Sequence, residues 1–279
     1  MLASRAEVLY RQGRSRKDGA VHWDGTGLPF IEPGDDFGEC ATVLADSYVD
    51  EFTLFPRIEP DSIEAAAIAG FMPMAARVET PLGPLAILIP KLHLRRCLLD
   101  PRLTHITRTA RRESSRYAFG MNTAFHEVTD ACLEVHGDEW LLPELVDAFC
   151  RLHGERASRR VAFLSAELWR GDGADRALVA GEIGYLVGSS YASLSGFSRV
   201  SGAGTVQLAA LGSLLAAKGI RVWDLGMPME YKLSLGGREL ARSRFLPLLR
   251  RAYTASADPA RAALVPASMP VNARGVIDS

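Results

Sequence analysis

Asp224 is the residue whose type and position most strongly suggest chemistry. It lies near the carboxyl end of the run IRVWDL at 220–225, which predicts a central strand of a sheet. A carboxylate there can orient an amine, or take a proton from an amine whose free pKa is about 8. The other interpretation is a carboxylate that caps or salt-bridges a loop.

A second candidate is the glycine-containing turn FSRVSGAG at 197–204. Its pattern Arg-x-x-Gly-x-Gly, from Arg199 through Gly202 to Gly204, is similar to the pyrophosphate-binding turn of acyl-CoA-dependent N-acetyltransferases. Glycines let the backbone approach a ligand, and amides at the start of a helix can face phosphates. Any strand-to-helix turn favours glycine, so a purely structural interpretation stays open.

Residues 91–116 form the one strongly basic stretch, with eight basic side chains against two acidic ones. The basic residues are Lys91, Arg95, Arg96, Arg102, Arg108, Arg111, Arg112 and Arg116. Such a stretch can track a phosphate backbone by charge, or it can be an ordinary solvated face. Because the formal net charge of the chain is −1, a polyanion site has to be a local patch of this kind.

Other chemistries lack a pattern in this sequence. His93 and His153 have no partner at His-x-x-x-His spacing, so no metal site is expected. The serines around 189–201 lack a Gly-x-Ser-x-Gly elbow, which argues against a serine nucleophile. The four cysteines are too widely spaced for a metal clip and are expected to be reduced thiols.

The elements that position these residues change character along the chain. Helices are expected at 61–70, 122–134 and 142–153, and an apolar strand at 82–90. A β-meander is then expected at 161–169, 177–187 and 190–197, followed by a helix at 204–218, the strand at 220–225 and a helix at 239–253. Three strands, a helix opening at a glycine turn, a strand and a helix are the core order of the N-acetyltransferase-like (GNAT-like) fold.

The expected class is therefore α/β, of the α+β kind, with a mostly antiparallel central sheet flanked by helices. With 279 residues, 48% of them hydrophobic, the chain is long enough for two modest domains. The expected division is a partly irregular arm at 1–50, a small α/β domain at 51–120, a GNAT-like domain at 121–254 and a disordered tail at 255–279. No segment has about 18 successive apolar residues, so a cytoplasmic protein is expected.

Beyond this order of elements, the sequence resembles the leucyl/phenylalanyl-tRNA–protein transferase family over roughly residues 58–247. That family moves an amino acid from charged tRNA to the N-terminus of a protein in N-end-rule degradation. The matching motifs, in order, are GFMP at 70–73, Leu92-His93, the helix ending at Cys132, Trp140, DAFCRLH at 147–153, Phe197-Ser198-Arg199, Asp224, Ser234-Leu235-Gly236, and Glu239 with Arg242.

Four positions depart from the family pattern. Met74 stands where the family has Trp, and Phe149 where it has Tyr. Leu194 replaces the family Glu, and Gly226 replaces the Gln of its Asp-x-Gln unit.

The resemblance implies roles for particular residues. Asp224 would handle protons, and Met74, Trp140 and Phe149 would shape the donor site, with Trp140 stacking on the terminal adenine of tRNA. The turn residues Phe197, Ser198, Arg199, Gly202 and Gly204 would bind substrate. The tRNA backbone would be held by Arg95, Arg96, Arg108, Arg111, Arg112 and Arg242. The partners would be aminoacyl-tRNA and an acceptor N-terminus, and no cofactor is expected.

Two alternatives stay open. A chain that kept the scaffold but changed its donor would be an N-acyltransferase that uses acetyl-CoA, which fits the presence of Gly202 and Gly204. A relative that lost catalysis would only bind N-terminal residues or RNA, which fits the loss of two family polar groups.

Overall fold

The structure is a computed structural model that describes residues 16–18, 21–23, 27–255 and 258–279, and they form two compact units. Unit 1 comprises the described residues up to Leu94 together with Gly137–Arg151 and Ala241–Leu246. Unit 2 comprises Arg95–His136, Leu152–Leu240 and the described residues from 247 onward. The expected arm at 1–50 falls partly outside the described residues.

The boundary expected near residue 120 differs from this division, because the chain passes between the units several times. The reason is visible inside unit 1, where a later segment packs with an early one. The backbone N–H of Ala75 donates to the carbonyl of Trp140 at 3.0 Å, and Arg77 forms an ion pair with Glu144 at 3.0 Å. Contacts between residues so far apart in sequence leave no mark on local composition.

Unit 1 contains two small sheets and several helices. Strands β1 (Arg16–Asp18), β2 (Val21–Trp23) and β3 (Pro29–Phe30) form one sheet, and β4 (Ala75–Thr80) pairs with β5 (Gly83–Leu88) in the other. The helices are α2 (Phe37–Ser47), α3 (Pro60–Ala69) and most of α6 (Pro143–Gly154). The helix expected at 61–70 is confirmed: Pro60 occupies its first turn, and Gly70 ends it at φ +95°, which an L side chain rarely adopts.

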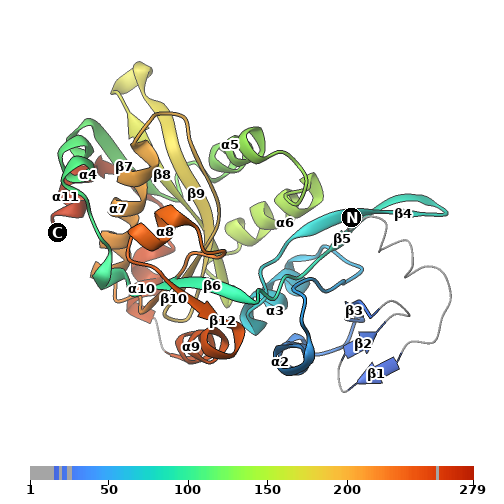
Figure 1. Ribbon diagram of the computed structural model, residues 1–279. Coiled ribbons are helices and arrows are strands. Elements are labelled where there is room, and N and C mark those ends of the chain that lie inside the picture. Colours follow the sequence, from blue (N-terminus) through green and yellow to red (C-terminus); the bar gives the residue numbers. More distant parts are fainter. Residues whose placement is uncertain (1–15, 19–20, 24–26, 256–257) are drawn as a thin grey trace. The chain divides into compact units, whose positions relative to one another are not determined.

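Unit 2 is built on an eight-stranded sheet (Figure 1), ordered β12-β6-β11-β10-β9-β8-β7-β13. The strands are β6 (Arg95–Leu99), β7 (Tyr117–Met121), β8 (Val161–Arg170), β9 (Ala177–Val187), β10 (Ser190–Ser198), β11 (Val222–Asp224), β12 (Arg238–Ala241) and β13 (Ser268–Asn272). The expected meander is confirmed, because β8, β9 and β10 pair successively and antiparallel. Strand β11 returns parallel to β10 after a helix, so the mixed α/β class with a mostly antiparallel sheet is also confirmed.

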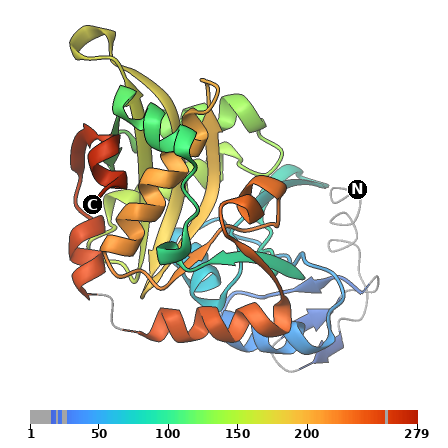
Figure 2. The ribbon, with the colours of Figure 1, turned by 60° about the vertical axis from the view of Figure 1, so that its left-hand side comes forward.

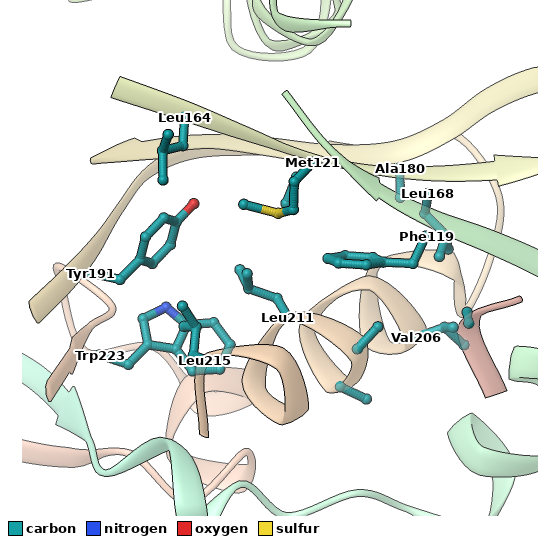
Figure 3. Packing of buried hydrophobic residues seen from close by; sticks show 14 of the residues in the cluster. Phe119, Met121, Leu164, Leu168, Ala180, Tyr191, Val206, Leu211, Leu215 and Trp223 are labelled. Carbon is teal, nitrogen blue, oxygen red and sulfur yellow. The ribbon is translucent and has the colours of Figure 1, made fainter. Parts of the chain in front are cut away.

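Helices cover this sheet, with α5 (Phe125–His136) and α7 (Ala203–Ala217) on either side of it in Figure 1. Figure 2 shows α7 lying across its face of the sheet. Figure 3 shows why α7 is apolar: Leu211 and Leu215 pack among Tyr191, Trp223 and Phe119, and all five are buried. Burial of this kind contributes about 25 cal/mol for each Å² of apolar surface removed from water.

The remaining helices complete the list of elements. They are α4 (Arg108–Glu113), α8 (Glu230–Ser234), α9 (Arg242–Thr254), α10 (Asp258–Leu264) and α11 (Ala273–Ile277), with 3-10 turns at Pro101–Leu103, Ser114–Arg116 and Gly173–Asp175. No helix within the described parts of the chain combines the length and apolar character that crossing a membrane requires.

Residues 258–279 differ from the disordered tail that the composition predicted, because they form two helices and a strand. Strand β13 pairs antiparallel with β7 at the edge of the sheet, and α11 packs against α7. The amide of Asn122 donates to the carbonyls of Leu264 and Val265 at 2.8 and 3.2 Å. An Ala- and Pro-rich composition suggested disorder, whereas a partner elsewhere in the chain supplies the contacts that order this segment.

Candidate active site

Asp224 ends β11 with its side chain fully buried. Its Oδ2 accepts a hydrogen bond from Nη1 of Arg96 at 2.8 Å, and its Oδ1 accepts one from the backbone N–H of Gly226 at 2.9 Å. Arg96 stands on the neighbouring strand β6 and is also fully buried. Burial lowers the pKa of Arg96, but Asp224 and the hydroxyls of Tyr185 and Tyr253 outweigh it and raise that pKa overall.

This placement fits the second of the two interpretations of Asp224, a carboxylate held in a salt bridge. Both of its oxygens accept hydrogen bonds, and its partner keeps a full positive charge in a fully buried site. Removing one member of such a pair leaves an uncompensated buried charge and costs about 3–5 kcal/mol. The pair therefore fastens β6 to β11, and the role of Asp224 in proton transfer stays a prediction.

Glu182 of β9 is a second buried carboxylate, which sequence reasoning missed. It accepts hydrogen bonds from the hydroxyl of Ser193 at 2.6 Å, the hydroxyl of Tyr191 at 3.2 Å and the amide of Gln207 at 3.3 Å. Burial raises the pKa of Glu182, although these three bonds oppose the rise. Its sequence clue was a single acidic residue inside the apolar strand ALVAGEIGYLV.

Ser193 connects Glu182 to the rest of the sheet. Its oxygen accepts a hydrogen bond from the indole N–H of Trp223 at 2.9 Å while its hydroxyl donates to Glu182. Ser193 is only half-buried, whereas Glu182 is 3% exposed. The Ser193 hydroxyl can therefore pass a proton to the buried carboxylate of Glu182. The raised pKa of Glu182 makes that carboxylate a stronger base.

Lys232 of α8 is the other group that the sequence gave no reason to select. Its ammonium donates to the carbonyl of Leu225 at 2.5 Å and to that of Met227 at 3.1 Å. Burial lowers its pKa, and the charges of Cys97, Glu182 and Asp224 oppose that change. The site thus gathers two carboxylates and a half-buried ammonium in one unit.

Pairing between strands β10 and β11 stops beside these groups, where β11 ends. The two strands pair in parallel only from Ser190 to Ala192, whereas β10 continues to pair with β9 as far as Ser198. The register of β10 shifts between Ser193 and Ser195, which marks a bulge. Bulges of this kind re-aim backbone amides and side chains, and they are common next to active sites.

Comparison with known proteins identifies the scaffold that carries this site. A family model described as "Leucyl/phenylalanyl-tRNA protein transferase" matches residues 98–250, more than half of the chain. The chain belongs to the leucyl/phenylalanyl-tRNA protein transferase family. Its members are aminoacyltransferases, and the resemblance inferred from the motifs is thereby confirmed.

Individual relatives agree with this assignment. The chain is 30% identical over 202 residues to the leucyl/phenylalanyl-tRNA–protein transferase of Roseobacter denitrificans, covering 70% of this chain and 87% of that protein. It is 33% identical over 171 residues to the enzyme of that name from an Azoarcus species, covering 60% and 69%. A solved structure of a conserved protein from Enterococcus faecalis V583 aligns at a TM-score of 0.37 and 10% identity over 81% of this chain and 55% of that one.

The turn that precedes α7 in this transferase family member is held by its own side chains. Ser198 accepts a hydrogen bond from the N–H of Gly204 at 3.1 Å and donates to the carbonyl of Val200 at 3.0 Å. Gly202 has φ +79°, and a Cβ on Gly204 would come within 3.3 Å of Ser198, which explains both glycines. This turn needs no bound pyrophosphate to account for its sequence.

Arg199 in the same turn is exposed, but its guanidinium already contacts other side chains. Its guanidinium forms an ion pair with Glu134 at 2.5 Å and lies 5.2 Å from the centre of the Phe197 ring. Phe197 itself is buried. These contacts do not favour the acyl-CoA alternative over the tRNA-dependent activity of the family.

The six arginines expected to contact tRNA divide into two groups. The first group lies in unit 2 and consists of the exposed Arg95, Arg108 and Arg112 and the half-buried Arg111. Three of them form ion pairs: Arg95 with Glu239, Arg111 with Asp278 and Arg112 with Glu113. Surface pairs of this kind contribute only about 0–1 kcal/mol, so a phosphate can replace the carboxylate at little cost.

Arg96 and Arg242 were expected on the basic surface, but both are buried. Arg96 is fully buried against Asp224. Arg242 is 4% exposed, and its guanidinium donates to the carbonyls of Tyr48 and Asp50 at 2.7 and 2.6 Å inside unit 1. The spacing of arginines in a sequence does not reveal which of them neutralise buried oxygens.

Three expected donor-site residues belong to unit 1. Phe149 is fully buried, whereas Trp140 and Met74 are half-buried. Met74 packs against the small core formed by Leu28, Leu54, Val78, Ile87 and Ile89. Their roles toward an aminoacyl group stay predictions, and of the three only Trp140 and Met74 offer exposed surface.

The four cysteines are free thiols, as expected. Burial raises the pKa of Cys40 and of Cys132 to about 12, and that of Cys97 to about 11. A thiol with so high a pKa is not ionised near neutral pH and is a poor nucleophile. The chemistry of this site therefore does not run through Cys97, although it lies beside Asp224 and Lys232.

Proposed function

We propose that this protein transfers a hydrophobic amino acid from aminoacyl-tRNA to the N-terminal amine of an acceptor protein. Family membership over residues 98–250 supports the proposal, and the relatives carry leucyl/phenylalanyl-tRNA–protein transferase as their name. The ester of aminoacyl-tRNA is already activated. The protein has to position the reactants, accept a proton from the amine and stabilise the developing oxyanion.

The observation that carries the mechanism is the hydrogen bond from Ser193 to Glu182. As the amine attacks the ester carbonyl, its proton passes to the oxygen of Ser193, which releases its own proton to Glu182. The carboxylate then returns the proton by way of Ser193 to the leaving ribose oxygen, which departs as the hydroxyl of the tRNA. Trp223 holds the serine oxygen in place through its indole N–H.

The remaining groups of the site position this relay. Backbone amides of β10 beyond Ala192, where pairing with β11 has stopped, are suited to receive the oxyanion. Arg96 and Asp224 hold the strand ends on which those amides depend. Asp224 is in this proposal a positioning residue, and Glu182 takes the role of proton acceptor.

The exposed or half-buried arginines of α4 and β6 are proposed to contact the tRNA backbone. Arg95, Arg108, Arg111 and Arg112 would act through charge rather than base identity, so binding should weaken as salt rises. Trp140 is half-buried, and its ring is the proposed stacking surface for the terminal adenine.

The test is a transfer assay with the purified chain, labelled leucyl-tRNA and a peptide with a free N-terminus. Label should move to the peptide, and acetylation of the peptide N-terminus should abolish the transfer. Transfer of an acetyl group from acetyl-CoA, with none from leucyl-tRNA, would contradict the proposal and support the N-acyltransferase. Binding of leucyl-tRNA without turnover would support the inactive relative.

A further inference from the structure

Strand β2 and the turn before α2 bring a histidine and two carboxylates together. Within the described ranges, His22, Glu32 and Asp35 are three potential metal ligands whose ligand atoms all lie within 4.8 Å of one another. We propose that this cluster binds a divalent transition-metal ion, with Zn²⁺ the best match. The cluster lies outside the residues matched by the family model, so it is independent of the proposed function.

The spacing of the ligand atoms suits a tetrahedral ion. Nε2 of His22 lies 3.2 Å from Oδ2 of Asp35 and 3.6 Å from Oε2 of Glu32. With zinc–ligand bonds of about 2.0–2.2 Å, two ligands of a tetrahedral site are separated by roughly 3.4 Å. The side chains therefore need only small adjustments to close around the ion.

His22 supplies an independent sign of a ligand. Its side chain is 9% exposed and its ring stacks on Phe30 with 5.2 Å between ring centres, which fixes the imidazole plane. Among the described residues, nevertheless, Nε2 finds no hydrogen-bond partner, so its approach to Asp35 is not a directed hydrogen bond. A buried polar atom without a hydrogen bond destabilises the fold, and a bound cation would satisfy it.

The two carboxylates are placed to complete the site. Oδ2 of Asp35 accepts a hydrogen bond from the backbone N–H of Glu32 at 2.9 Å. This bond orients the Asp35 carboxylate toward the histidine. The side chain of Glu32 is 56% exposed, so an ion can enter from solvent and a water can supply the fourth ligand. One nitrogen with two oxygens suits Zn²⁺ better than Mg²⁺ or Ca²⁺, which favour oxygen ligands alone.

The ion would have a structural role. His22 lies on β2, whereas Glu32 and Asp35 lie in the turn whose next residue, Asp36, caps α2. A metal bond across this segment would fasten the small sheet of unit 1 to the start of the helix, and binding to the folded state alone raises stability by mass action.

The test uses the 279-residue chain without a histidine tag, stripped with EDTA and then titrated with Zn²⁺. Calorimetry should give about one Zn²⁺ per chain, and the thermal midpoint should rise on binding. Both effects should be lost in His22→Gln and in Glu32→Gln. The matched control is His105→Gln, an exposed histidine of unit 2, which should retain both.

Glu32→Gln keeps the test decisive if His22→Gln does not fold, because the Glu32 side chain is exposed and contributes little to packing. Co²⁺ in place of Zn²⁺ should give the intense visible absorption of a tetrahedral site, and Glu32→Gln should remove it. Absence of Zn²⁺ binding by the unaltered chain would overturn the proposal. So would equal binding by the unaltered chain and Glu32→Gln.

Discussion

Asp224 and Glu182 are two buried carboxylates in the same sheet, and they differ in what compensates their burial. Asp224 faces the charged guanidinium of Arg96, whereas Glu182 receives hydrogen bonds from two hydroxyls and one amide. Neutral donors offset less of the cost of burying a charge than a cation does, and burial accordingly raises the pKa of Glu182.

The difference separates structural support from proton transfer. A carboxylate paired with a buried cation compensates the charge of that cation, and its loss would leave the cation unpaired. A carboxylate with neutral partners can change protonation state without leaving a buried charge behind. The proposed function accordingly assigns structural support to Asp224 and proton transfer to Glu182. Four experiments test the proposal, and the first three can sharpen or break this contrast.

The largest expected effect is on stability, in Asp224→Asn. Arg96 would keep its charge in a buried site without a partner, so we expect the free energy of unfolding to fall by about 3–5 kcal/mol. Urea denaturation measures it. Arg96→Met combined with Asp224→Asn should cost less than the sum of the two single changes, and strict additivity would show that the pair does not act as a unit.

The next effect is on turnover, in Glu182→Gln. Loss of the proton acceptor should lower kcat for transfer about 10²–10⁴-fold, with a stable fold and unchanged tRNA binding. Glu167→Gln is the matched control, since Glu167 is also buried, accepts hydroxyl bonds from Ser165 and Thr123, and has a raised pKa. Similar losses in both variants would remove the special role of Glu182.

A smaller effect concerns the pH dependence of stability. The folded state holds the proton of Glu182 more tightly than the unfolded chain, whose pKa is near the ordinary value of 4.5. The resulting stabilisation is complete below about pH 4.5 and is lost as pH rises through the raised pKa. Compared with Glu182→Gln, the unaltered protein should therefore lose stability as pH rises above 4.5, as urea denaturation at a series of pH values would reveal. A constant difference between the two proteins would argue against the raised pKa.

The smallest effect is expected at the exposed arginines. Arg112→Ala should weaken tRNA binding by a few-fold and reduce the slope of log K against log salt by about one unit. Binding titrations at several salt concentrations measure this slope. Arg102→Ala is the matched control, because Arg102 is also exposed and ion-paired, with Asp100, but lies outside α4 and β6. Equal slopes in all three proteins would remove α4 from the interface.

Much of the fold could be predicted because the relevant information is local. The helices at 61–70, 122–134 and 204–218 and the three strands of the meander follow from apolar periodicity and glycine stops, and they lie within a few residues of the observed elements. The short strands β6, β7 and β13 escaped prediction, because their pairing partners rather than their own sequences define them.

The site was predicted less completely for the same reason. The motifs located Asp224 and the turn at 197–204, but they could not show that Arg96, 128 positions earlier, neutralises Asp224. Nor could they distinguish Glu182, which became notable only when Ser193 and Gln207 were seen to donate to it.

The sequence by itself determined the family, the order of the main elements and the residue types available for chemistry, since each of these is written in local pattern and composition. Only the tertiary structure decided which charges are compensated. Compensation depends on distances between residues far apart in the chain, and burial makes those distances decisive because water no longer screens the charges.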